Sequence, residues 1–215
     1  MYPPGSTTAS LTINAPGEYP TDVAVMGNYV YVTNIVTTTG GSGSLVAYFK
    51  NGTMYRQNYN CPELQRWFFV AADKHGNVFV DGADASDLPH VVEFLQTTLS
   101  CTDLGISLNF PGGLQVDNAG NLVVDDQEGA TTTYAAPSFT TAIATTDVGG
   151  AEGTAPPTIA LQKGNAYIWS ANVDSLAGGL NQWAYPVGGT ALQTFSFPGN
   201  ENEAIGVAVW PRDNQ

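Results

Sequence analysis

"PGGLQVDNAGNLVVDD", residues 111–126, decides the fold class of this chain. Two short apolar runs flank an Asp-Asn-Ala-Gly-Asn segment, and Gly and Asn tolerate the positive φ angles that tight hairpin turns require. The stretch therefore predicts a β-hairpin. Both runs are continuously apolar rather than alternating, which is typical of strands that are buried on both faces.

The same hairpin pattern occurs four times along the chain. Gly-Asn pairs stand at 27–28, 76–77, 120–121 and 164–165, separated by 49, 44 and 44 residues. A third apolar run and a more polar fourth run follow each pair. Four strands per repeat of about 45 residues indicate a β-propeller built of four-stranded blades. A two-sheet sandwich, the alternative, would explain the strands but not the period.

The two ends of the chain match parts of a repeat. Residues 1–17 align with residues 184–199, and the Val-Ala-Val of residues 207–209 matches residues 23–25. We therefore expect an all-β propeller of five blades, the last shared between N- and C-terminal strands, which hides open strand edges. Its second strand has no sequence, so either that strand is missing or the chain is a piece of a longer one. The expected single domain divides into third and fourth strands at 1–14, complete blades at 20–60, 66–104, 111–146 and 156–197, and a first strand at 204–210.

Charge restricts the partners. Six Lys and Arg stand against 19 Asp and Glu, a net charge of −13. Phosphate backbones would be repelled, so nucleic acid is not expected as a partner, and no apolar run approaches the roughly 18 residues of a membrane span. The balance favours a cation, a glycan or a basic protein surface. Few Lys and many Thr, Gly and Asn are typical of extracellular bacterial proteins, so we expect an extracellular or cell-surface location, with any signal peptide outside the given sequence.

The repeat motifs also carry a family resemblance. "VDNAGNLVVDD" (116–126), "ADKHGNVFVDG" (72–82), "GNYVYVTN" (27–34) and "YPPGSTTASLTI" (2–13) resemble the NHL/YVTN-type propellers of secreted bacterial proteins. That group is often labelled streptogramin-lyase-like or SMP-30-like. The resemblance covers nearly the whole chain and implies the fold, whereas propellers host many functions.

The enzymes in this group imply metal sites that the sequence does not complete. The lyase type uses His and Glu with a divalent metal, but this chain has only His75 and His90, and His75 lies in a hairpin turn. The lactonase type uses carboxylates and Asn on inner strands, and the inner-strand starts offer only Asp22. We therefore expect no catalytic residues and no cofactor, although Ca²⁺ could bind to acidic loops.

Acidic residues gather on one face of the predicted propeller. We call upper the face with the loops from second to third strands and from fourth to first strands, where propellers bind ligands, and lower the opposite face. The expected upper-face acids are Glu18, Glu63, Asp84, Asp87, Asp126, Glu128, Glu152, Asp174, Glu201 and Glu203. Four of the six basic residues are expected on the lower face, namely Lys50, Lys74, Lys163 and Arg212.

Three functions fit this pattern. The first is a non-enzymatic binding module that uses the acidic upper face, where Tyr19 and Trp169 could stack on a sugar. The second is a structural protein whose acidic and basic faces stack into filaments by self-association. The third is a degenerate lyase-like or lactonase-like enzyme. We rank them in that order.

The two cysteines are predicted to pair. Cys61 follows the fourth strand of one repeat, and Cys101 lies in the fourth strand of the next. Both should lie near the upper rim, where the chain crosses between the blades, so a disulfide is expected.

Overall fold

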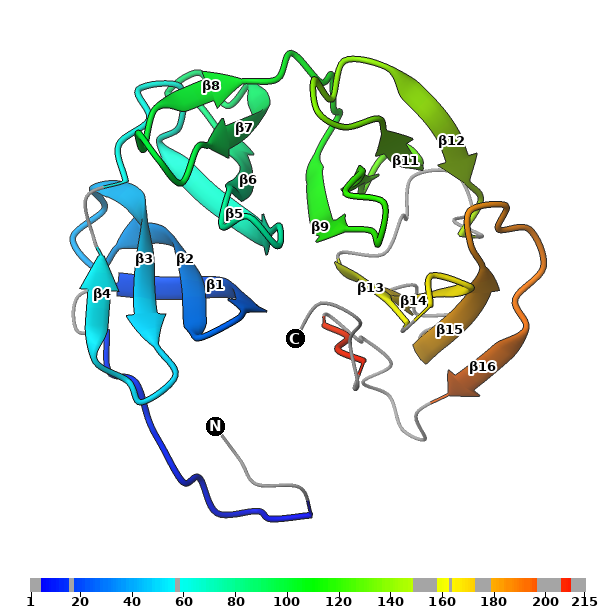
Figure 1. The fold of residues 1–215 in the computed structure, drawn as a ribbon, viewed down its shortest axis with the longest axis horizontal. Coiled ribbons are helices and arrows are strands. Elements are labelled where there is room, and N and C mark those ends of the chain that lie inside the picture. The colour runs from blue at the N-terminus through cyan, green and yellow to red at the C-terminus, as the bar shows by residue number, and fades with distance from the viewer. Residues whose placement is uncertain are drawn as a thin grey trace.

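The computed structural model describes residues 5–15, 18–56, 59–148, 158–162, 164–172, 179–196 and 206–209. Within them, sixteen strands form four antiparallel sheets, each pairing its strands in chain order. Figure 1 shows the sheets arranged around a common centre, with β1, β5, β9 and β13 innermost. The predicted all-β propeller of four-stranded blades is confirmed.

Each of the four blades contains four consecutive strands. The first blade contains β1 (Glu18–Met26), β2 (Tyr29–Thr37), β3 (Ser42–Phe49) and β4 (Met54–Arg56). The second contains β5 (Arg66–Ala72), β6 (Val78–Ala83), β7 (Pro89–Phe94) and β8 (Cys101–Asp103). The third contains β9 (Pro111–Val116), β10 (Leu122–Asp126), β11 (Thr131–Tyr134) and β12 (Ala142–Thr146). The fourth contains β13 (Thr158–Leu161), β14 (Tyr167–Asn172), β15 (Gly179–Ala184) and β16 (Gln193–Ser196).

The Asp-x-x-Gly-Asn segments form the expected hairpin turns. In the third blade, Asp117 Oδ1 accepts the backbone N–H groups of Ala119 and Asn121, at 2.9 and 2.8 Å. Gly120 adopts φ 88°, which is why glycine stands there. Asp73 and Gly76 repeat the arrangement in the second blade. The repeat therefore encodes its own turn.

Apolar side chains fill the seams between neighbouring blades. Between the first and second blades, Trp67 stacks on Phe94 with ring centroids 5.7 Å apart, and Leu45 packs in the same cluster. Phe79 and Phe139 meet edge to face between the second and third blades, at 5.0 Å. The continuous apolar runs of the second and third blades are explained, because their inner strands pack against a blade on either side.

The fifth blade stays a prediction. Figure 1 shows the described residues 5–15 and 206–209 on the side of the ring between the first and fourth blades. Neither segment forms a strand, although Ile13 packs on the first blade and the Val207 N–H donates to Thr158 Oγ1 at 3.0 Å. The other residues of the expected closing blade lie outside the described residues. In the described part of the chain, no helix is long and apolar enough to cross a membrane.

Gly113 sets how closely the third and fourth blades approach. A Cβ atom there would lie 2.6 Å from the Ile159 backbone nitrogen and 3.1 Å from Thr158 Cα. Because backbone cannot move aside as a side-chain tip can, Gly113→Ala is expected to lower the free energy of unfolding by about 1–3 kcal/mol. Urea denaturation measures this change. Gly206→Ala is the control, since nothing lies within 4 Å of its Cβ position, and equal losses in the two variants would contradict the close contact.

Candidate functional site

Aromatic side chains mark the upper ends of three successive innermost strands. Tyr19 is the second residue of β1 and is 53% exposed. Phe68 is half-buried near the start of β5, and Phe110, which precedes β9, is 42% exposed. The rings of Phe68 and Phe110 are 6.0 Å apart. The upper ends of these strands thus carry aromatic side chains, and Tyr19, Phe68 and Phe110 are here called the aromatic rim.

Hydrogen bonds between the first two blades hold the Phe68 backbone in place. Thr33 Oγ1 donates to the Phe68 carbonyl at 2.7 Å, and the Val70 N–H donates to Asp22 Oδ2 at 3.0 Å. Thr21 Oγ1 also donates to the Trp67 carbonyl, at 3.4 Å. Part of the rim is therefore fixed by rigid sheet rather than by a mobile loop.

Asp126 holds Phe110, another rim residue, in place. Its buried carboxylate accepts the backbone N–H groups of Asn109, Phe110 and Glu128, at 2.9, 3.0 and 3.1 Å. The Asn109 side-chain amide adds a fourth bond at 3.1 Å. Asp126 therefore acts as a structural anchor that brings the exposed Phe110 and the exposed Glu128 together, rather than as an open ligand.

The acids of the β6–β7 loop are also engaged. Asp84 Oδ1 accepts the N–H groups of Leu88 and Ser86, at 2.9 and 2.7 Å, and these bonds hold the pKa of Asp84 below its usual range. Asp87, 74% exposed, is ion-paired with Arg66. His90 Nδ1 lies 2.7 Å from Asp103 Oδ2, and we assign the proton to this nitrogen because the carboxylate accepts. His90 is thereby a structural side chain.

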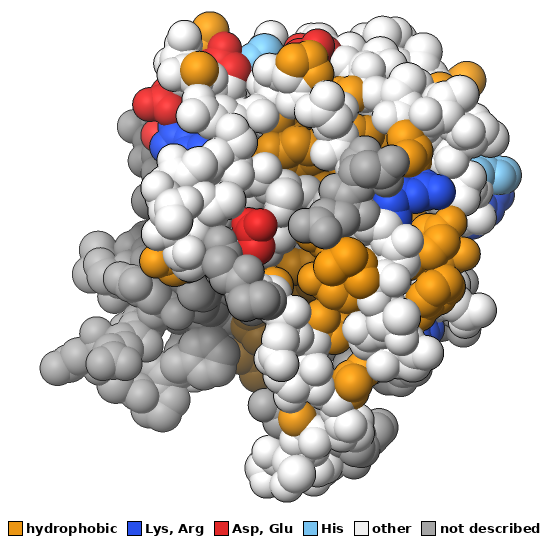
Figure 2. Space-filling model, turned by 90° about the vertical axis from the view of Figure 1, so that its left-hand side faces the viewer, with side chains coloured by type: hydrophobic (Ala, Val, Ile, Leu, Met, Phe, Trp, Pro, Cys, Tyr) orange, Lys and Arg blue, Asp and Glu red, His pale blue; other side chains and the backbone are white. Residues whose placement is uncertain are grey.

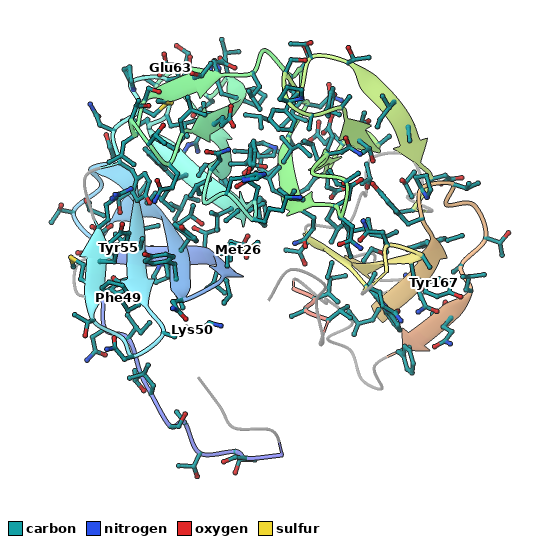
Figure 3. The ribbon with its side chains drawn as sticks, in the orientation of Figure 1. Met26, Phe49, Lys50, Tyr55, Glu63 and Tyr167 are labelled. Atoms are coloured by element: carbon teal, nitrogen blue, oxygen red, sulfur yellow. A yellow bond between two sulfur atoms is a disulfide. The ribbon has the colours of Figure 1, made fainter. Side chains whose placement is uncertain are left out.

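Glu18 and Glu63 do not lie together. Tyr48 lies on the open side of the first blade. Burial raises the pKa of Tyr48, and the nearby Glu18 raises it further. Figure 3 places Glu63 at the periphery of the ring. Its Oε2 is 3.0 Å from Cys61 Sγ, a contact rather than a hydrogen bond because a disulfide sulfur carries no proton. The expected acids therefore do not converge on one point.

Cys61 and Cys101 form a disulfide with Cα atoms 5.4 Å apart, which is the expected pairing. In the described residues, Cys61, Cys101 and Glu63 make up the group whose atoms lie close enough to share a metal ion. The disulfide occupies both sulfurs. No other group of three such residues in the described part of the chain lies close enough to share a metal ion.

Two buried carboxyl groups, those of Asp81 and Asp125, were not among the site residues expected from the sequence. Asp81 and Asp125 are fully buried at matching positions of β6 and β10, where the pairing with the innermost strand is irregular. Asp81 Oδ1 accepts the Phe69 N–H at 2.8 Å, and Thr131 Oγ1 donates to Asp125 Oδ1 at 2.5 Å. The Oδ2 atom of each makes no hydrogen bond with the described residues. Each carboxyl thus lies at an irregularity of the sheet, where some backbone groups have no partner on the neighbouring strand.

Burial is the main reason why the pKa of both groups is raised. Desolvation raises the pKa of Asp81 well above its usual range, and the nearby Asp22 and Asp125 raise it further. Burial raises the pKa of Asp125 from 3.8 to about 7, although the bond from Thr131 opposes the shift. Both carboxyls therefore favour the protonated form more than exposed aspartates do.

The remaining sequence-based site residues fall into two groups. Glu152, Asp174, Glu201, Glu203, Lys163 and Arg212 lie outside the described residues. Trp169 does not stand free for a sugar at the upper face, because it stacks on Phe195 at 5.9 Å and donates to Gln162 in the lower β13–β14 turn. The separation of charges is partial, since Asp73 and Asp117 lie in lower turns beside Lys74.

Phe68 and Phe110 were not predicted as site residues. Both stand where an innermost strand begins, so an aromatic residue at that point of each repeat was the signal available. Figure 2 views the ring from its first blade and shows few charged side chains over the described part of that side. The sparse charge agrees with a composition of 12% charged residues.

Comparison with known proteins identifies the fold. No protein-family model and no curated protein sequence matches the chain. Among solved structures, the WD40 β-propeller domain of Doa1 has TM-score 0.58 and 12% identity, over 89% of this chain and 59% of that one. YCF48 bound to D1 peptide has TM-score 0.56 and 12% identity, over 80% and 53%. XC5397 from Xanthomonas campestris, a gluconolactonase, has TM-score 0.53 and 12% identity, over 74% and 58%.

The chain thus spans between half and three fifths of the length of these structures. At this identity the similarity shows the fold alone, so the chain is a β-propeller, and the NHL/YVTN type remains a prediction.

Proposed function

We propose that the chain is a non-enzymatic, extracellular binding module whose upper channel mouth recognises a basic segment of another protein. The observation that carries this proposal is the aromatic rim of Tyr19, Phe68 and Phe110 on adjacent innermost strands. Exposed aromatic side chains on rigid backbone are typical anchors of protein interfaces. Their faces also attract Lys and Arg side chains.

Charge near the rim supports a basic partner. Glu128 is exposed and is held beside Phe110 by Asp126. Of the basic residues in the described ranges, Arg66 alone lies on an innermost strand, and Asp87 is its ion-pair partner. With a net charge of −13, the protein attracts cationic segments at long range. A shared fold with YCF48, which binds a peptide, is compatible with a protein partner.

The proposal predicts binding of a hexalysine peptide. We expect a dissociation constant in the micromolar range at low salt, weakening at least tenfold between about 50 and 300 mM salt, because screening removes charge attraction. Phe110→Ala should weaken binding about five- to tenfold, and Glu128→Gln about threefold. Isothermal titration calorimetry measures these changes.

Phe195→Ala is the matched control. Phe195 is 50% exposed, comparable to Phe110, but lies on the outermost strand β16. Its replacement should leave hexalysine binding unchanged. Equal effects of the two phenylalanine variants would contradict the proposed mouth site, and salt-dependent sedimentation of the protein alone would favour the stacking function instead.

A further inference from the structure

A cavity opens on the lower face, between the second and third blades, away from the aromatic rim. Its volume is about 210 Å³. Two hairpin turns line it, residues 73–77 and 117–121, together with Glu93 of β7 and the β11–β12 turn. It is thus walled by a seam between two rigid blades.

Two fixed negative charges flank this cavity. Asp73 and Asp117 are 8% and 7% exposed. Asp73 accepts the N–H groups of His75 and Asn77 at 2.8 and 2.9 Å, and the Asn77 side-chain amide at 2.9 Å. Asp117 is held in the same way by its own turn. Because the turns hold both carboxylates in place, they attract a cation that enters the cavity without any rearrangement of the protein.

Glu93 supplies a third carboxyl that the fold does not use. It is half-buried, and it makes no hydrogen bond or ion pair with any residue in the described part of the chain. Burial raises the pKa of Glu93, and the charge of Asp73 raises it further. A cationic partner would relieve both effects, since it compensates the lost hydration and the repulsion.

Part of the cavity lining is apolar. Val116, Pro137 and Phe139 belong to this part, and Lys74 lies at the edge of the cavity as an exposed side chain. Anions would meet three carboxyl groups and one ammonium, so they are disfavoured. The carboxylates are not close enough together to form a metal-binding group. A lining that combines apolar side chains with negative charge suits an ion that has a hydrocarbon body and one ammonium group.

We propose that this cavity binds a small organic ammonium ion, with its hydrocarbon body against Phe139 and Val116 and its ammonium group at Glu93. The site is independent of the basic-segment site at the channel mouth. Benzylamine is a suitable probe, because it is protonated at neutral pH, and benzyl alcohol has the same shape without the charge.

Benzylamine is expected to bind with a dissociation constant of roughly 1 mM, because a ligand of so few atoms can make only a few contacts. Benzyl alcohol should bind at least tenfold more weakly. Glu93→Gln should weaken benzylamine binding about tenfold and leave benzyl alcohol binding unchanged. Glu128→Gln, which removes the same charge from the upper face, should alter neither affinity.

Amide chemical-shift titration provides both the affinities and the location. The proposal requires shifts in residues 73–77 and 117–121. Ala119→Trp, which fills the cavity while keeping its charges, should abolish the binding of both probes and so gives a second test if Glu93→Gln folds poorly. Equal affinities for the amine and the alcohol, unchanged binding in Glu93→Gln or Ala119→Trp, or shifts elsewhere would overturn the proposal. Hexalysine binding at the mouth would be unaffected by any of these results.

Discussion

Asp125→Asn is expected to stabilise the protein at pH 8 and to destabilise it at pH 4. The folded chain raises the pKa of this carboxyl from 3.8 to about 7. Below pH 4 the folded and unfolded chains both hold the proton, so burial of this group carries no ionisation penalty. Between pH 4 and 7 the unfolded chain loses its proton first, which favours unfolding, and above pH 7 the penalty stays constant. The full penalty is about 4 kcal/mol, at about 1.4 kcal/mol per pKa unit.

Asparagine removes that penalty but has a cost of its own. Its oxygen can still accept from Thr131, whereas its amide replaces an Oδ2 atom that has no hydrogen-bond partner in the described residues. Two buried donors without acceptors cost about 1–3 kcal/mol at every pH. The effect of the substitution on the free energy of unfolding should therefore differ between pH 8 and pH 4 by about 4 kcal/mol and change sign.

Urea denaturation at the two pH values checks this expectation. Glu128→Gln, at an exposed position, is the control and should show almost no difference between them. If Asp125→Asn has the same effect at pH 4 and pH 8, the carboxyl does not stay protonated in the fold.

Loss of the Cys61–Cys101 disulfide should give the second large effect. The bridge closes a loop with a sequence separation of 40 residues. In the chain-entropy description, a cross-link of this span stabilises the fold by about 4 kcal/mol. The variant C61A/C101A is therefore expected to unfold at a temperature lower by roughly 10 °C, as measured by circular dichroism.

Reduction separates this effect from the loss of side-chain packing. Dithiothreitol should lower the unfolding temperature of the parent protein towards that of C61A/C101A and should not change that of the variant. A parent protein whose unfolding temperature is the same with and without the reductant would contradict the stabilising bridge.

Repeat spacing and turn chemistry made the blades predictable. The Gly-Asn period located the four hairpins, because their turns need residues that adopt positive φ angles. The fourth strands were recognisable by their polar residues, because each is the outermost strand of its blade. All four residues of β16, for example, are exposed. The pairing of Cys61 with Cys101 followed from the same strand assignment.

The candidate site was less predictable, for a physical reason. A sequence shows which residues are acidic but not whether backbone N–H groups engage them. Asp84 and Asp126 were expected to face a ligand, yet both accept hydrogen bonds from backbone N–H groups of nearby loops. Conversely, Asp81 and Asp125 lie in apolar runs that predict strands. Only the three-dimensional packing reveals that these two carboxyl groups are buried.

Amide chemical-shift mapping with hexalysine tests the central claim most directly. The account predicts that the amides of residues 19, 68, 109–110 and 128 shift as the peptide is added, and that these shifts fade at high salt. Shifts that spread evenly over the surface, or that gather at the lower turns and spare the aromatic rim, would contradict a binding site at the upper channel mouth.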